Sequence, residues 1–369
     1  MTTLFLCGDV MTGRGIDQIL GHPTAPGLHE PYVKDARQYV RLAEQTSGRI
    51  DRPVSGDYIW GFALETLQEI APEVRIVNLE TAVTTSGDSC KGKGIHYRMS
   101  PGNLGCLTAA KIDCCTLANN HVLDWGYAGL EETLNSLRQA GLNTAGAGPD
   151  LRSARSPALL QSSNGNRIVV FATATLDSGV PPSWAAEEDR PGVALLPHLS
   201  EEGFAETARH IAGGRRDESD IVVVSIHWGG NWGYDIPAEQ REFAHRLIEE
   251  ADVDIVHGHS SHHVKGLEVH RDRLILYGCG DLITDYEGIS GHETFRGDLS
   301  LLYLADVDPE TGRLKSLRMQ PTQMRQFQLN RPSDRDVSWL HDTLNRQSKQ
   351  FGASVDLEQD GMLHLRIPS

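Results

Sequence analysis

The segment LANNHVLDWGYAGLEETLNSL, residues 117–137, decides how the rest of the chain is interpreted. The apolar run that ends at Leu117 predicts a short buried strand, and leucines at helical spacing between residues 130 and 137 predict an amphipathic helix. Two asparagines and His121 stand between them, at the carboxyl end of the strand, where α/β proteins bind ligands. A turn favours Asn, Asp or Gly but does not need a His beside two Asn. We therefore predict a functional site in an α/β fold.

Composition and charge exclude several classes of protein. The chain of 369 residues is 39% hydrophobic and 23% charged, which suits a globular protein with a sizeable core. Its net charge of −16 repels nucleic acid and anionic membranes, so neither is expected as a partner. The first residues, MTTLFLCGDV, lack the features of a signal peptide, and the apolar runs are too short for a membrane span, so we expect a cytoplasmic protein. The six cysteines form no CxxC pair, which favours reduced thiols.

Apolar runs and helical periodicities alternate along the chain, as is typical of an α/β layered fold. The predicted strands are Thr3–Cys7, Val74–Asn78, Asp113–Leu117, Arg167–Ala172, Ile221–Ile226, Val253–His257 and Leu274–Tyr277. The predicted helices cover residues 32–46, 60–70, 128–140, 199–212 and 237–251. The polar segments 85–98 and 175–197 are expected to be loops over the sheet that cover a site.

The pattern changes after residue 298. Residues 299–306 and 314–319 predict antiparallel strands, and residues 334–349 predict a polar surface helix. We expect one domain over residues 1–330, with residues 331–369 as a C-terminal helix and strand extension packed on it.

Most of the predicted parallel strands end in polar residues that can bind a metal. In chain order these residues are Asp9, Asn78 and Glu80, Asn120 and His121, His227, the four histidines His257, His259, His262 and His263, and Asp281. Because parallel strands bring their carboxyl ends to one edge, these side chains are expected to meet in one crevice. Carboxylates, imidazoles and an amide oxygen are ligands for divalent ions, so we predict a metal site there.

The ordered motifs GDVM-GR, VNLE, ANNH-LDWG, HWG and GHSSH resemble the CapA-like branch of the calcineurin-type metallophosphoesterase superfamily, over residues 3 to about 285. That branch is known for poly-γ-glutamate capsule synthesis. The resemblance implies a four-layer α/β fold, with two packed mixed sheets flanked by helices. It also implies one or two divalent ions, with Mn, Zn, Fe and Co as the candidates.

The resemblance also implies a place for each ligand. Asp9 and His262 would bind the first metal, and Glu80 would stand as a bridging carboxylate. The second metal would be held by three residues: Asn120, His227 and His259. The motif GHSSH is one residue longer than the GHxH of the superfamily, so His257 remains an alternative to His259. Met11 stands where the superfamily has a histidine, and a thioether is a poor ligand for a hard ion, so the first site is expected to lack one nitrogen.

Two chemistries suit such a site, and we prefer peptide epimerisation. A divalent ion can polarise a carbonyl, after which neighbouring bases remove and return the Cα proton. The soluble branch of the family is similar to lasso-peptide epimerases, which act on a precursor peptide. The residues predicted to take part in the chemistry are His121, Asp124 (which would orient His121), Asp9 and His292. The residues predicted to bind substrate are Arg14, Trp232 and Tyr234.

The alternative is a metal-dependent hydrolase, either a phosphoesterase or an amidase, linked to poly-γ-glutamate metabolism. Its substrate would be an amino-acid polymer, and the complete second ligand set together with His121 favours it. A third hypothesis is a non-enzymatic binding module with a closed metal site.

Overall fold

Strand β1 (Thr2–Val10) lies near the middle of a ten-stranded sheet in this computed structural model, which describes residues 1–214, 217 and 219–367. The hydrogen-bonded order is β20-β21-β18-β17-β1-β2-β5-β6, with β16 also pairing with β1 and β19 with β18. The bounds of these strands are β2 Val74–Leu79, β5 Cys114–Thr116, β6 Asn143–Ala145, β16 Asp281–Ile283, β17 Leu299–Val307, β18 Leu314–Arg325, β19 Gln328–Asn330, β20 Ser354–Leu357 and β21 Leu363–Arg366. Strands β1, β2, β5, β6 and β16 are parallel, and the others run antiparallel to their neighbours, so the sheet is mixed.

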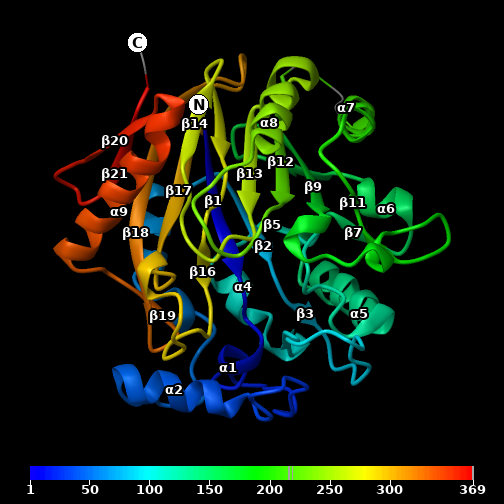
Figure 1. Ribbon diagram of the computed structural model, residues 1–369, viewed down its shortest axis with the longest axis vertical. Helices are drawn as coiled ribbons and strands as arrows, with labels where there is room; N and C mark the ends of the chain where they lie inside the picture. The colour runs from blue at the N-terminus through cyan, green and yellow to red at the C-terminus, as the bar shows by residue number, and fades with distance from the viewer. Residues whose placement is uncertain (215–216, 218, 368–369) are drawn as a thin grey trace.

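A second, seven-stranded sheet has the order β11-β9-β12-β13-β15-β14, with β8 pairing with β9. Its strands are β8 Ala158–Gln161, β9 Arg167–Thr175, β11 Leu195–Leu196, β12 Ile221–His227, β13 Ile255–His259, β14 Leu267–His270 and β15 Arg273–Leu276. Two small sheets pair β3 (Ala82–Val83) with β4 (Arg98–Met99) and β7 (Ala147–Gly148) with β10 (Gly192–Val193). The two large sheets lie side by side in Figure 1.

The main apolar core lies where the two large sheets pack, and alternation along the strands builds it. In β9, Ile168 and Val170 join the core shared with the large sheet, while Val169 and Phe171 face a second core under the helices. This is the period-two pattern of a strand that is buried on both faces. Helices α7 (Glu201–Gly214) and α8 (Ala238–Ala251) cover that outer face.

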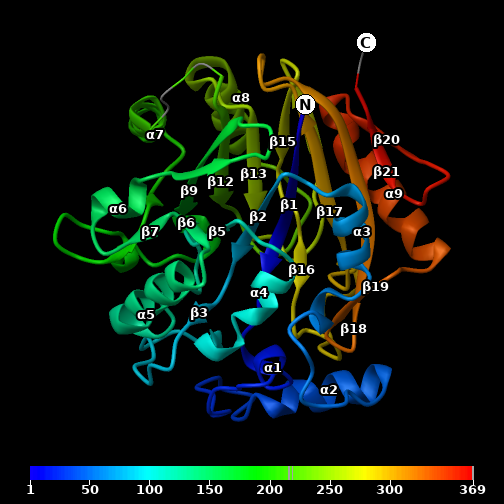
Figure 2. The ribbon, with the colours of Figure 1, turned by 180° about the vertical axis from the view of Figure 1, so that it is seen from behind.

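The other helices flank the large sheet or the ends of its strands, except α6 (Leu151–Arg155), which packs against β7 and β10. These other helices are α1 Arg14–Asp17, α2 Arg37–Ser47, α3 Ala63–Ile70, α4 Gly105–Ala109, α5 Gly126–Gln139, α6 Leu151–Arg155 and α9 Asp334–Ser348. Figure 2 shows α3 and α4 across the back of the molecule, with α1 and α2 below the strand ends. In the part of the chain that the structure describes, no helix combines the length and apolar character needed to cross a bilayer.

The structure confirms the predicted fold class of mixed sheets flanked by helices. Each predicted helix forms, but the one expected over residues 32–46 begins only at Arg37. The helix expected to be a polar surface element, α9, buries Leu340 and Leu344 completely, so it is amphipathic and packs on the body of the protein. Strands β20 and β21 of the C-terminal segment continue the large sheet through β18. Residues 368–369 of the predicted extension lie outside the described residues.

Candidate metal centre

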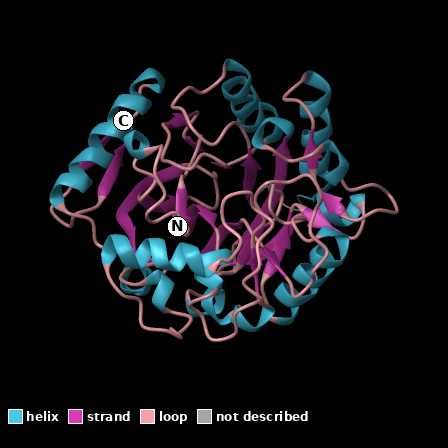
Figure 3. Cartoon of the chain, turned by 60° about the horizontal axis from the view of Figure 1, so that its bottom comes forward, coloured by secondary structure: helices cyan, strands magenta, loops and turns pink. Residues whose placement is uncertain are grey.

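The register of the parallel strands brings the predicted ligands to one edge. Asp9 of β1 lies opposite Asn78 of β2 and Asp281 of β16. In the second sheet, His227 at the end of β12 lies opposite His259 at the end of β13. Figure 3, with the bottom of the molecule brought forward, shows loops crossing these strand ends. The site therefore forms where the carboxyl ends of both sheets meet, as expected for an α/β fold.

Two groups of buried ligands share Asp9. One consists of Asp9, His227 and His259, and the other of Asp9, His262 and Asp281; within each group the ligand atoms all lie within 4.8 Å of one another. The Nδ1 atoms of His227 and His259 are 2.8 Å apart, so the two imidazoles converge. Three convergent N and O ligands make a candidate site for a divalent ion, and a shared carboxylate links the two.

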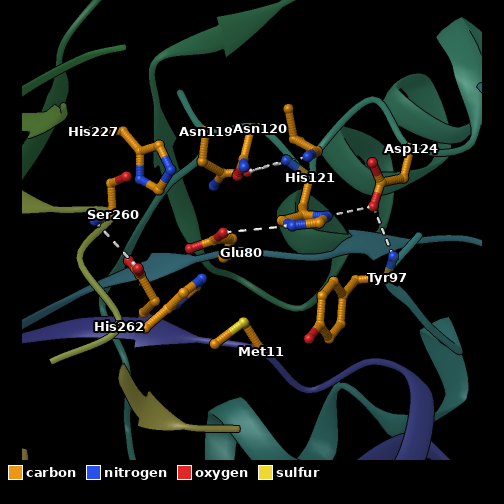
Figure 4. Close-up of polar contacts among 12 residues, drawn as sticks. Met11, Glu80, Tyr97, Asn119, Asn120, His121, Asp124, His227, Ser260 and His262 are labelled. Atoms are coloured by element: carbon orange, nitrogen blue, oxygen red, sulfur yellow. Dashed lines mark hydrogen bonds and ion pairs between the residues drawn. The ribbon is translucent and has the colours of Figure 1, made fainter. Parts of the chain in front are cut away.

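Several buried polar atoms at this edge have no hydrogen-bond partner among the described residues. They are Oε2 of Glu80, Oδ1 of Asn120, Nε2 of His227 and Oδ2 of Asp281. An unsatisfied buried polar atom costs about 1–3 kcal/mol, so four together need an explanation. All four are atoms of types that can bind a divalent ion, and Figure 4 shows Glu80, Asn120, His227 and His262 around one space. The residues present therefore fit one or two divalent ions.

His257 and Asn119 differ from these ligands because their polar atoms are already used. The Nε2 of His257 is 2.7 Å from the carbonyl oxygen of Cys7, and its Nδ1 is 3.2 Å from the Ser225 hydroxyl. The side chain of Asn119 accepts from two backbone N–H groups of the following turn. His259 also contacts the Ser225 hydroxyl, with its Nε2 at 2.7 Å. It is His259, however, that lies in one group with Asp9 and His227, which favours it over His257 as a ligand. Asn119 has a role in shaping the turn.

Asp281 is the ligand candidate that the sequence placed at the edge but did not assign. Its Oδ1 lies 2.9 Å from Nδ1 of His262, and Asp281 pairs in register with Asp9. Met11, where the resemblance implied a histidine, is buried, with its sulfur 3.8 Å from the Tyr286 hydroxyl. The group of Asp9, His262 and Asp281 therefore has three candidate ligands without an imidazole at position 11. Asp281 is the first residue of β16, and its pairing with Asp9 of β1 brings it to the site.

Burial dominates the titration of these groups. Burial, followed by the charge of the neighbouring Asp281, raises the pKa of Asp9 to about 7. The pKa of Glu80 also lies well above its usual range, because of burial and then the charge of Asp9. Burial lowers the pKa of His262, but the Asp281 carboxylate outweighs this effect and raises the pKa overall. Clustered carboxylates with raised pKa values are typical of sites that a cation neutralises.

His121 and Asp124 form a hydrogen-bonded pair beside the ligands. The Nδ1 of His121 is 2.6 Å from Oδ2 of Asp124, while its Nε2 is 3.7 Å from Oε1 of Glu80 (Figure 4). Burial lowers the pKa of His121 to about 4, although Asp124 opposes the shift. The imidazole is therefore neutral at pH 7, with Nδ1–H donated to Asp124 and the Nε2 lone pair toward Glu80.

Lys93, a neighbour of this pair, was not among the residues predicted from the sequence. Its Nζ contacts the Asn120 carbonyl and Oδ1 of Asp124, and it lies 3.1 Å from Nδ1 of His121. It comes from the predicted loop 85–98, whose Tyr97 N–H also donates to Asp124.

Arg14 is buried, and its guanidinium is hydrogen-bonded to protein side chains. Its guanidinium donates to Asp285, Glu30 and Tyr39 and stacks over aromatic rings. Arg14 is only 3% exposed. This burial favours a role in holding the loops together, whereas the sequence predicted that Arg14 contacts substrate.

A group of aromatic side chains lies beside His262, one of the candidate ligands. Trp232 lies with its ring centroid 5.4 Å from that of His262 and stacks on His292 at 4.0 Å. Tyr234 packs against His263, and its hydroxyl oxygen is buried with no partner among the described residues. His292 itself is exposed. Trp232 and Tyr234 therefore form an aromatic group beside His262 and His263, and His292 lies on its exposed side.

Comparison with known proteins identifies the class to which this fold and site belong. Residues 3–286 match the model of the bacterial capsule synthesis protein family PGA_cap. The chain belongs to this family.

Individual relatives refine the comparison. The chain is 47% identical over 366 residues to the "Probable polyglutamine synthesis accessory protein" of Mycobacterium tuberculosis, covering 99% of this chain and 96% of that protein. It is 26% identical to the "PGA biosynthesis protein CapA" of Bacillus subtilis, over 75% of this chain and 62% of that protein. It is 23% identical to the "Capsule biosynthesis protein CapA" of Bacillus anthracis, over 77% and 60% respectively. These names concern polymer synthesis, and they do not support a peptide epimerase.

Proposed function

We propose that this protein is a metal-dependent hydrolase that cleaves amide bonds in a glutamyl polymer, within poly-γ-glutamate or capsule metabolism. One observation carries the proposal: at one buried edge, four candidate ligand atoms lack a hydrogen-bond partner within residues 1–214, 217 and 219–367. They belong to Glu80, Asn120, His227 and Asp281. The family and the names of the relatives support the polymer as the substrate class.

The ligands divide into two sets in this proposal. Asp9, His262 and Asp281 would hold one ion, and Asp9, His227 and His259 a second, with Glu80 and Asn120 adding oxygens. When bound, a divalent ion polarises the scissile carbonyl and lowers the pKa of water. One ion is enough for this chemistry, and the shared Asp9 would couple the two if both are present.

His121 would carry the proton. Its neutral imidazole points Nε2 toward Glu80 and the metal ligands, while Asp124 holds Nδ1–H. Nε2 can therefore take a proton from the attacking water and return it to the leaving nitrogen, as a general base and then a general acid. Asp124 fixes the tautomer that this requires.

The aromatic side chains would guide the polymer. Trp232 and Tyr234 stand beside His262 and His263, so they can pack on the methylene groups of a glutamyl chain. Arg14 would hold the loops that close the site, since its guanidinium is taken by Asp285 and Glu30. His292, stacked on Trp232, would line the entrance, where its exposure suits contact with substrate.

Mass spectrometry in isotopic water tests the proposal and its competitors together. Protein loaded with Mn²⁺ or Zn²⁺ is incubated with γ-glutamyl oligomers, in H₂¹⁸O and separately in D₂O. Shorter products carrying one ¹⁸O in the new carboxylate are expected. An unbroken chain that takes up one deuterium per altered residue would establish epimerisation instead. Intact oligomers, together with turnover of a panel of phosphate esters, would establish a phosphoesterase.

A further inference from the structure

The loop over residues 85–98 is attached to the site mainly through Asp124. The backbone N–H of Cys90 donates to the Asp124 carbonyl at 2.8 Å, and the N–H of Tyr97 donates to its Oδ2 at 2.6 Å. Between these two points the loop extends Lys93 back to the same residue. Gly92 and Gly94 flank Lys93, and a side chain at either glycine would meet open space. The segment around Lys93 is therefore held by its side chain rather than by packing of its backbone.

The ammonium group of Lys93 is largely removed from solvent. Its side chain is 17% exposed and lies 5.0 Å from the centre of the Trp184 ring, which belongs to the second covering loop. Its N–H groups donate to the Asn120 carbonyl and to Oδ1 of Asp124, and its Nζ lies 3.1 Å from Nδ1 of His121. A lysine held this way differs from a surface ion pair, because the carboxylate it contacts is fully buried.

The contacts of Asp124 divide between its two oxygens. Oδ1 accepts a hydrogen bond from the Lys93 ammonium group. Oδ2 accepts one from the N–H of Tyr97 and faces Nδ1 of His121. With both oxygens engaged, the plane of the carboxylate is fixed, and so is the direction in which His121 donates. If Lys93 were removed, Oδ1 would lose its charged partner and the carboxylate could rotate about its terminal torsion, which is soft.

We propose that Lys93 is a positioning residue for the hydrolysis proposed above, on which this inference rests. It holds Asp124 so that His121 keeps its proton on Nδ1 and presents Nε2 to the site. Lys93 acts through Asp124, whose Oδ1 accepts from its ammonium group. Loop 85–98 thus completes the catalytic apparatus in addition to covering it.

Two substitutions of equal size on the same loop test this role. Lys93→Met removes the ammonium and keeps the length of the side chain, and Lys91→Met does the same at an exposed position. In Lys93→Met we expect kcat to fall about 10- to 100-fold, the range for residues that orient catalytic groups, with KM changing far less. Lys91→Met should match the wild type. Ethylamine added to Lys93→Ala should restore part of the lost kcat, which a purely structural defect would not allow.

A spectroscopic measurement keeps this inference separate from the proposed function. Nitrogen-15 shifts of the metal-loaded protein, assigned with His121→Gln, report which ring nitrogen of His121 carries the proton. The wild type should show the Nδ1–H tautomer, and Lys93→Met a mixture of both. A pure Nδ1–H tautomer in Lys93→Met, or an unchanged kcat, would overturn the role of Lys93. A wild type without hydrolase activity would overturn the proposed function, while the tautomer would still decide about Lys93.

Discussion

Two clusters of histidines and carboxylates in this molecule look alike in composition but differ in how their polar atoms are used. In the α8–β14 cluster, formed by His245, Glu249, Glu268 and His270, each imidazole has its own carboxylate. The two rings stack in parallel, with centroids 3.8 Å apart. At the strand ends, by contrast, the Nδ1 atoms of His227 and His259 face each other at 2.8 Å.

The difference teaches which observation identifies a metal centre. Both places bring three ligand atoms within 4.8 Å of one another, so proximity does not distinguish them. In the α8–β14 cluster, Nε2 of His245 bonds Glu268, and Tyr277 donates to the other oxygen of Glu268. At the strand ends four buried ligand atoms have no protein partner among the described residues. Unpaired buried atoms, rather than residue types, are therefore the stronger sign of a bound ion.

The largest effect that follows from this comparison is on bound metal. His227→Ala removes a candidate ligand whose Nε2 has no hydrogen-bond partner in the part of the chain that the structure describes. We therefore expect loss of at least one equivalent of tightly bound metal and of hydrolase activity. Asp9→Ala, which touches both groups, should remove all of it. Metal content after dialysis, measured by mass spectrometry of the metals, checks both.

The matched control for these substitutions is His245→Ala, which removes a histidine from the α8–β14 cluster. It should leave metal content and turnover at wild-type values, because that imidazole is satisfied by Glu268. Metal lost equally from His245→Ala and His227→Ala would show that the comparison fails.

Metal removal should also lower stability through the strand-end site. A ligand that binds only the native state stabilises it by about 4 kcal/mol when present at 1,000 times its Kd. We expect EDTA to lower the melting temperature of the wild type by several degrees and to leave Asp9→Ala unchanged. Differential scanning calorimetry with and without the chelator measures the shift. An equal shift in both proteins would place the stabilising ion elsewhere.

Substitution of His121 should separate chemistry from metal binding. His121→Ala keeps every ligand atom at the strand ends but removes the group that moves the proton, so kcat should fall about 10²- to 10⁴-fold. Metal content should match the wild type. Turnover of a γ-glutamyl oligomer and metal analysis of the same sample give the answer, and a wild-type kcat would remove His121 from the mechanism.

The sequence predicted the helices and the long strands well because their periodicity is local. Helix α5, expected over residues 128–140, runs from Gly126 to Gln139. Strands β12 and β13 end at His227 and His259, one and two residues beyond their predicted ends. Strand β16, only three residues long, has no periodicity of its own and is fixed by its pairing with β1, so the role of Asp281 was missed. Lys93 was missed because its position depends on hydrogen bonds between Asp124 and an irregular loop. Such contacts leave no periodic pattern in the sequence.

The smallest effect concerns the pH dependence of the α8–β14 cluster. The pKa of Glu249 lies below its ordinary 4.5. The largest cause is the hydrogen bond from His270; burial opposes it, and the charge of Arg271 lowers the pKa further. A carboxyl with a lowered pKa in the folded state contributes stability above its unfolded pKa, and this contribution is lost as the pH falls through the folded value. His270→Ala should therefore lower the free energy of unfolding slightly at pH 7, and the difference from the wild type should shrink below pH 4.5. Urea unfolding at the two pH values measures it. Because Glu249 is exposed to solvent, salt should weaken the effect further. The metal content of His270→Ala at pH 7 should stay constant, unlike that of a variant that removes a strand-end ligand.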